Sequence, residues 1–369
     1  MRTYVFRLAL ACIVVSCAAA GINFFIDSKS NFALSGEAGA RVVERYVAKL
    51  RESATGLVMV EQDRLVKAEL ARQSADDCYV IGSSHLFQFD ATTAPRVFEG
   101  CRSVANLAVS AGGFEDFVAL AGILAAREDH LKFFVEIAPW SLRPNPAPLW
   151  TEYEHVYDRG RMVFALGQRP FGFSNVLGEW AGLFRADYAI MNLKFLAEHG
   201  FWIGSEGAAR EFRGVPASEA KDDEVVFLPD GRLGYPAVLL QSAPPDPALI
   251  GDGGFNMADP ALDPTTISEL EHTVAYLLRR GHKVTFVMTP YHPSVTACRT
   301  PSVCRTLQAV ETFARQVAIG WNVPLIGGFD PRPFGLIRQD FMDDMHLLSS
   351  GLSKFDASFT RPIAQSYAR

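Results

Sequence analysis

Short apolar runs alternate with amphipathic helical patterns along most of the chain. The apolar runs are four or five residues long, which is the length of buried strands; they are Cys78–Ile81, Val104–Ala108, Phe133–Ile137, Val284–Met288 and Val323–Ile326. Helical patterns lie between or after them at Glu115–Arg127, Ile267–Arg280, Val303–Ile319 and Leu352–Tyr367. This alternation indicates βαβ units. We therefore predict an α/β fold, a flavodoxin-like three-layer sandwich with about five mostly parallel strands.

A long segment at about residues 145–265 interrupts this alternation. It separates the third apolar run from the fourth and is too long for a single crossover, so we expect an insertion with structure of its own. Leu228–Gly231 within it reads as a hairpin turn. Its aromatic residues fit either a core or a sugar-binding surface; they are Trp150, Tyr153, Tyr157, Phe171, Phe173, Trp180 and Trp202.

The N-terminal residues contain a run without charge. Leu8–Ile26 spans 19 residues, which is long enough to cross a bilayer as a helix. Arg2 and Arg7 precede the run, so the positive-inside rule places the N-terminus in the cytoplasm. We therefore predict a single-pass protein of a bacterial inner membrane, with residues 1–29 as the anchor and a catalytic domain in the periplasm.

Two other interpretations of this run stay open. One is a signal peptide cleaved near Ala18–Ala20, and the other is a lipoprotein modified at Cys17. Residues 30–75 are polar and predict a helical stalk, with apolar positions at helical spacing at Val43, Tyr46, Val47 and Leu50. The α/β domain is then expected over residues 76–369.

Composition excludes several classes of protein. Hydrophobic residues make up 49% of the 369 residues and charged residues 21%, which excludes a disordered or coiled-coil chain. The formal net charge is −6 and there is no basic block, so we expect no nucleic acid as a partner.

Four cysteines lie outside the apolar run, and they allow three disulfide pairings. The most local pairing is Cys78 with Cys101 and Cys298 with Cys304, and the alternative is four unpaired thiols. Neither a CxxC pair nor a His-x-x-x-His spacing occurs in the sequence. We therefore expect no metal site and no cofactor.

Polar residues follow the predicted strands at the edge where α/β proteins bind ligands. Ser84 follows the first strand, and Asp343 and His346 precede the last helix. A serine hydroxyl becomes a nucleophile when a base removes its proton and a third group orients that base. We predict that Ser84 is the nucleophile, His346 the base and Asp343 the residue that orients His346.

An acyl-transfer site also needs donors for the developing oxyanion. We expect them to be the N–H of Ser84, the N–H of Gly112 or Gly113, and the side-chain amide of Asn145 or Asn106.

Simpler interpretations of these residues also stay open. Ser84 fits an N-cap of a helix, and Asp343 and Asp344 fit ordinary acids of a loop. His292, which follows the fourth strand, is a substitute base, although no acid stands beside it in the sequence.

The order of these motifs resembles the SGNH, or GDSL-like, hydrolase superfamily, which carries its serine in a first block and Asp-x-x-His in the last. The amino-acid sequences of these motifs are similar to those of a membrane-anchored bacterial branch of the superfamily, which is associated with polysaccharide O-acetylation. The matching segments are Ile22–Asp27, Ile81–Ser84, Asn106–Ser110 and Ala138–Trp140. The Gly-x-Asn-Asp of the third block is absent, and Asn145 is its nearest substitute.

The resemblance implies a serine esterase or O-acyltransferase that acts on acyl groups, acetyl above all, of a cell-envelope or exopolysaccharide glycan. Its partners would be an acylated glycan or another acyl donor, the inner membrane and polysaccharide biosynthesis proteins. The missing third block leaves an alternative function, a non-catalytic scaffold that binds polysaccharide or a secretion complex.

Overall fold

The structure is a computed structural model, and it divides the chain into two compact units. It describes residues 2–25, 37–58, 63–127, 130–143, 154–167, 184, 186–199, 212–221, 224–236, 238, 240, 261–298 and 300–358. The first unit comprises residues 1–49, 149–154 and 169–213, and the second comprises the remainder of the chain.

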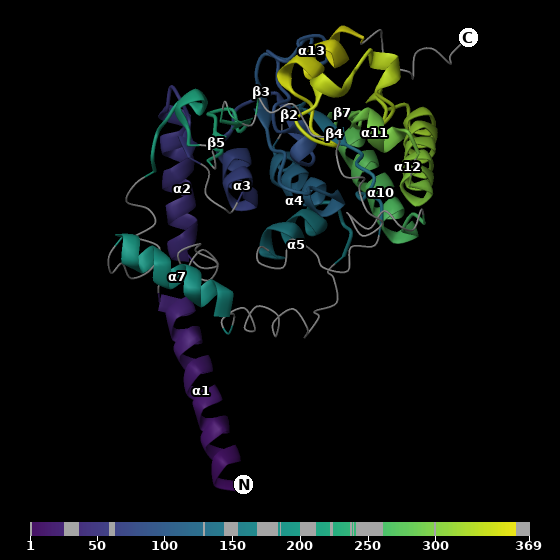
Figure 1. Ribbon diagram of the computed structural model, residues 1–369. Coiled ribbons are helices and arrows are strands. Elements are labelled where there is room, and N and C mark those ends of the chain that lie inside the picture. The colour runs from purple at the N-terminus through teal and green to yellow at the C-terminus, as the bar shows by residue number, and fades with distance from the viewer. Residues whose placement is uncertain are drawn as a thin grey trace, which may run out of the picture. The chain divides into compact units, whose positions relative to one another are not determined.

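A five-stranded sheet forms the centre of the second unit (Figure 1). Its strands are β2 (Cys78–Ile81), β3 (Val104–Asn106), β4 (Lys132–Glu136), β7 (Lys283–Met288) and β8 (Leu325–Gly327). They pair in the order β3-β2-β4-β7-β8, and every pairing is parallel. Numbered along the chain, this order is 2-1-3-4-5, which is consistent with a flavodoxin-like sandwich. The prediction of an α/β fold with five parallel strands is confirmed.

Right-handed crossovers between parallel strands place helices on both faces of a sheet with this strand order. The crossovers to β4, β7 and β8 run in one direction and carry α4 (Phe114–Ala125), α10 (Pro264–Arg279) and α12 (Pro301–Gly320). The crossover from β2 to β3 runs in the other direction, and α13 (Ser349–Ala357) packs on it. There the Asp356 carboxylate accepts the N–H groups of Arg96 and Val97 at 2.8 and 3.0 Å.

Residues 57–73, which the sequence assigned to the stalk, belong to the second unit. β1 (Leu57–Val58) joins β5 (Val226–Phe227) and β6 (Leu233–Gly234) in a three-stranded antiparallel sheet. The predicted turn at Leu228–Gly231 connects β5 to β6, and Gly231 permits it with a φ of 88°. α3 (Asp63–Gln73) then packs on α4 with most of its residues buried.

The described part of the predicted insertion also contains α5 (Glu154–Val163), which joins α10 through a salt bridge of 2.7 Å between Arg161 and Glu269. Tyr157 on α5 is buried, so it belongs to a core. The remaining aromatic residues named for the insertion lie outside the described residues.

The described part of the first unit contains α1 (Arg2–Phe25), α7 (Ala186–His199) and the larger part of α2 (Glu37–Glu52). Asn23 of α1 is buried, and its side-chain oxygen accepts a hydrogen bond of 3.1 Å from the Asn192 amide of α7.

Within the described residues, no helix combines the length and apolar character that a bilayer crossing needs. This finding contradicts the predicted transmembrane anchor and, with it, the single-pass inner-membrane location. The prediction counted uncharged residues, but Ser16, Gly21 and Asn23 in that run contribute little apolar surface.

Both local disulfides are present. Cys78, the first residue of β2, is bonded to Cys101 just before β3, and Cys298 is bonded to Cys304 across the start of α12. Of the three pairings that the sequence allowed, the structure contains the most local one.

Candidate active site

Ser84 lies at the carboxyl edge of the sheet, after Gly82 and Ser83, which follow β2. It begins a 3-10 turn, η2 (Ser84–Leu86), which Ser83 caps by accepting the N–H of His85 at 3.3 Å. The Ser84 N–H stands at the first position of this turn, where a helix offers no acceptor within itself. In the capping interpretation Ser84 itself would be the cap, but the structure gives that role to Ser83.

Two glycines allow this turn to lie close to its neighbours. A Cβ on Gly82 would lie 2.5 Å from Cβ of Glu136, and a Cβ on Gly112 would lie 2.1 Å from the carbonyl oxygen of Gly82. Both distances are far below van der Waals contact. The loop after β3 and the end of β4 therefore both contact the turn that carries Ser84.

The structure brings Ser84, His346 and Asp343 into one hydrogen-bonded chain. Ser84 Oγ lies 2.7 Å from Nε2 of His346, and Nδ1 of the same ring lies 2.6 Å from Oδ2 of Asp343. The other carboxylate oxygen of Asp343 accepts the N–H groups of Met345 and His346 at 2.9 and 2.8 Å. This geometry is that of a nucleophile, a base and the residue that orients the base.

A tight turn between β8 and α13 supports this arrangement. Phe341 and Leu347 form an antiparallel bridge, and the Met342 N–H donates to the carbonyl of His346 at 2.8 Å. Three residues of separation then place the Asp343 carboxylate and the imidazole on the same side of the turn.

Asp343 has a pKa below its ordinary value. Burial raises the pKa of this carboxyl, but the hydrogen bond and charge of His346 and the N–H groups of Met345 and His346 outweigh that effect and lower it. An ionised carboxylate only accepts hydrogen bonds, so the proton of His346 lies on Nδ1. Nε2 is then the acceptor that faces the Ser84 hydroxyl.

The expected oxyanion donors are not assembled as predicted. The Gly112 N–H donates to the carbonyl of Val109 at 3.1 Å, and the Gly113 N–H donates to Asp116 at 2.9 Å. Gly112 is thus needed for close packing, and its N–H is already used within the turn. Asn145 lies outside the described residues. Of the predicted donors, the Ser84 N–H remains the candidate.

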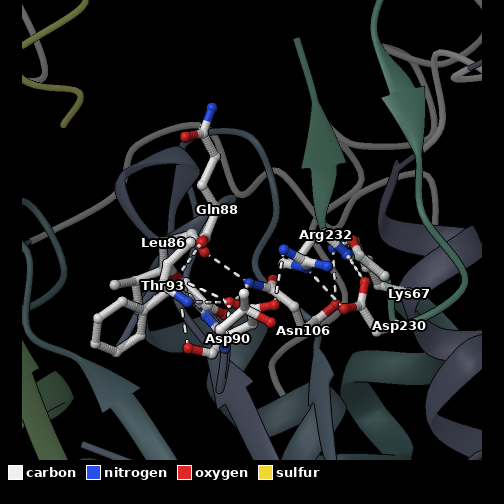
Figure 2. A network of polar contacts seen from close by, with 11 residues as sticks. Lys67, Leu86, Gln88, Asp90, Thr93, Asn106, Asp230 and Arg232 are labelled. Carbon is white, nitrogen blue, oxygen red and sulfur yellow. Dashed lines mark hydrogen bonds and ion pairs between the residues drawn. The ribbon is translucent and has the colours of Figure 1, made fainter. Parts of the chain in front are cut away.

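Asn106, the other amide considered, has a different task. Figure 2 shows its side chain pointing to the chain that follows Ser84, where Nδ2 donates to the carbonyls of Leu86 and Phe89 at 2.6 and 3.1 Å. Both amide protons are therefore used to shape the loop after Ser84.

The hairpin of the insertion contacts the same loop beside Asn106, whose N–H donates to the carbonyl of Asp230 at 2.7 Å. In Figure 2, Arg232 extends between Asp90 and Asp230, with 2.7 Å to each carboxylate. The N–H of Leu233 donates to the carbonyl of Phe87 at 3.0 Å. Sequence reasoning identified the hairpin turn but not its target, because that contact joins segments about 140 residues apart in the chain.

His292, the substitute base, is completely buried. Its Nδ1 accepts the backbone N–H of Ser294 at 3.1 Å and lies 2.8 Å from the Ser294 hydroxyl, and its ring packs against Phe341. His292 therefore shapes the start of a short helix, and the imidazole that faces Ser84 is that of His346.

Glu136 and His85 also lie at this edge of the sheet. Sequence reasoning did not identify Glu136 and assigned no role to His85. The available signal was a single carboxylate at the end of an otherwise apolar strand, Phe133-Phe134-Val135-Glu136, because an isolated charge is costly to bury.

Within the part of the chain that the structure describes, no group of three or more His, Cys, Asp or Glu side chains forms a metal-binding cluster. In comparisons with known proteins, neither a family model nor a curated protein matches the sequence, so the assignment of the site rests on the geometry above.

Proposed function

We propose that this protein is a serine esterase or O-acyltransferase of the SGNH type. The observation that carries the proposal is the hydrogen-bonded chain from Ser84 Oγ through His346 to Asp343, with 2.7 and 2.6 Å between the bonded atoms. An ordinary capping serine needs no imidazole on its hydroxyl, and an ordinary loop acid needs no ring nitrogen on its carboxylate.

The first half-reaction forms an acyl-enzyme. Ser84 Oγ attacks the carbonyl carbon of an acyl ester while Nε2 of His346 takes the hydroxyl proton. The negative charge that develops on the carbonyl oxygen is stabilised by the N–H of Ser84. The tetrahedral intermediate then breaks its bond to the alcohol, which leaves with the proton held by His346.

The second half-reaction releases the acyl group. His346 takes a proton from water or from a sugar hydroxyl, whose oxygen attacks the acyl carbon and frees Ser84 Oγ, which takes the proton back. Asp343 stays ionised throughout and stabilises the imidazolium that forms twice in each cycle. Hydrolysis and transfer differ only in the acceptor, so the same three residues serve both.

The topology supports the SGNH assignment. The nucleophile follows the first strand of the parallel sheet, and Asp343-x-x-His346 precedes the last helix, which is the arrangement of that superfamily. The strand order and the helices on both faces support its flavodoxin-like three-layer sandwich.

For the substrate we propose an acetyl ester of a polysaccharide. The support is the resemblance of Ile81–Ser84, Asn106–Ser110 and Ala138–Trp140 to the bacterial branch associated with polysaccharide O-acetylation. The acyl donor would then be an acetylated glycan or another activated acetyl compound.

The test is labelling of the full chain with a fluorophosphonate probe, together with turnover of an aryl acetate. We expect labelling at Ser84 and its complete loss in Ser84→Ala. We expect His346→Ala to lower kcat on the order of 10⁴-fold or more and Asp343→Ala to lower it less, because triad residues act as a unit.

Ser110→Ala is the matched control, since Ser110 is an exposed serine at the same edge of the sheet. It should keep wild-type labelling and turnover. A folded wild type that takes up no probe and transfers no acetyl group, even with a glycan acceptor present, would contradict the proposal.

A further inference from the structure

Glu136 lies in the interior beside the nucleophile turn. It is the last residue of β4, and its side chain is 2% exposed. One carboxylate oxygen, Oε2, accepts the N–H of Ser83, and the other, Oε1, lies 2.9 Å from Nδ1 of His85. Glu136 thus contacts the residue before Ser84 and the residue after it.

His85 is buried to the same degree, with a side chain that is 1% exposed. Its Nδ1 also lies 3.1 Å from the hydroxyl of Thr289, which follows β7. The ring packs edge to face against the ring of His346, with 5.4 Å between centroids. Contacts through this one imidazole therefore join the ends of β2, β4 and β7 to the base of the triad.

We propose that Glu136 and His85 are a positioning pair that aims the Ser84 hydroxyl at His346. The inference rests on the proposed function, since it assigns these two residues a task in the same reaction. By holding Ser83 and His85, the pair fixes the backbone on both sides of Ser84 and therefore the direction of its Cβ–Oγ bond.

The charges of the pair support this assignment. Burial raises the pKa of Glu136, but the charge and hydrogen bond of His85 and the N–H of Ser83 lower it below its ordinary value. The ionised carboxylate accepts both bonds, so Nδ1 of His85 carries a proton and donates it. A buried carboxylate with two donors is rigid, because losing either bond leaves a desolvated charge.

Two substitutions of His85 separate positioning from packing. In His85→Asn the side-chain NH₂ takes the place of Nδ1–H and still donates to Glu136, but the rest of the ring is lost. In His85→Leu much of the volume is kept and the donor is lost. If the pair positions Ser84, His85→Asn keeps most of kcat, whereas His85→Leu lowers kcat on the order of 100-fold with KM unchanged, as misplacement of a reacting group does.

If His85 only fills space, the order reverses, and His85→Leu is the more active variant. Glu136→Gln gives a second measurement, because its amide accepts one N–H but offers Nδ1 of His85 no negative charge. We expect it to lower kcat as His85→Leu does. Equal kcat in His85→Leu, Glu136→Gln and wild type would overturn the inference.

A readout that does not require turnover distinguishes failure of this inference from failure of the proposed function. The ¹⁵N NMR shift of His346 Nε2 reports whether this nitrogen accepts the Ser84 hydroxyl. The shift should change in His85→Leu and stay as in wild type in His85→Asn, even if the protein turns over no ester. An unchanged shift in both variants refutes positioning whether or not the protein turns over an ester, and Ser84 labelling by the fluorophosphonate probe then tests the proposed function separately.

Discussion

Lys67 is a lysine without exposed surface, and it should make the stability of the second unit depend on pH. It lies on α3, where Nζ donates to the carbonyls of Asn106 and Gly231 at 2.9 and 2.6 Å (Figure 2). Burial lowers its pKa to about 7, although the charges of Asp63 and Asp230 act in the opposite direction.

The direction of the effect follows from comparing the two states. In the unfolded chain the pKa of a lysine is about 10.4. Between about pH 7 and pH 10 the unfolded state therefore binds more protons than the folded state, so the free energy of unfolding rises with pH. Lys67 raises the free energy of unfolding by up to about 1.4 kcal/mol for each pH unit. Over the whole range from about pH 7 to pH 10 this increase adds up to roughly 4–5 kcal/mol. Below about pH 7 Lys67 is charged in both states, so the folded protein bears the full cost of burying its ammonium group.

The assay is urea unfolding of wild type and Lys67→Met across this pH window. The free energy of unfolding of the variant should depend less on pH, because the group whose pKa differs between the folded and unfolded states is gone. It should also lose about 1–3 kcal/mol at high pH, since the carbonyls of Asn106 and Gly231 lose their donor. Lys283→Met, at an exposed position of β7, is the control and should keep the wild-type slope. Equal slopes in wild type and Lys67→Met would refute the reasoning.

Three further predictions concern the frame of the site. Gly112→Ala places a Cβ 2.1 Å from the Gly82 carbonyl, so it should lower both the melting temperature and probe labelling; unchanged labelling would contradict the packing argument. Asn106→Ala removes two bonds to the loop after Ser84 and should cost about 2–3 kcal/mol in urea unfolding. Thiol counting on denatured, unreduced protein should find only Cys12 and Cys17 reactive, since the other four cysteines are paired.

Much of the sheet could be predicted from the sequence because its signals are local. The run Cys78–Ile81 coincides with β2, the run Val284–Met288 lacks only the first residue of β7, and the run Phe133–Ile137 is shifted by one residue from β4. A buried parallel strand must be apolar on both faces, so such a strand is visible in a window of a few residues.

The meeting of Ser84, Asp343 and His346 could also be predicted, for a topological reason. The carboxyl ends of parallel strands meet at one edge of the sheet, so Ser84 after the first strand and His346 before the last helix lie close together in space although 262 residues separate them. The local spacing of Asp343 and His346 is enough to place the carboxylate beside the imidazole.

Other features depend on contacts that no short window contains. A count of uncharged residues took Leu8–Ile26 for a membrane span, whereas in the described chain Asn23 is buried and bonded to Asn192. The oxyanion assignment failed at Gly112 because the use of an N–H depends on which carbonyl the fold brings to it, here that of Val109.

The sequence by itself determined that Ser84, Asp343 and His346 meet at one edge of the sheet, because the strand pattern follows from local hydrophobicity and parallel strands end at a common edge. Only the tertiary structure decided what holds Ser84 in place. Glu136 and His85 are 51 residues apart in the chain and meet because β2 and β4 pair in register. A buried charge finds its partner through the packing of the whole sheet, and this packing leaves no periodic signal in either segment.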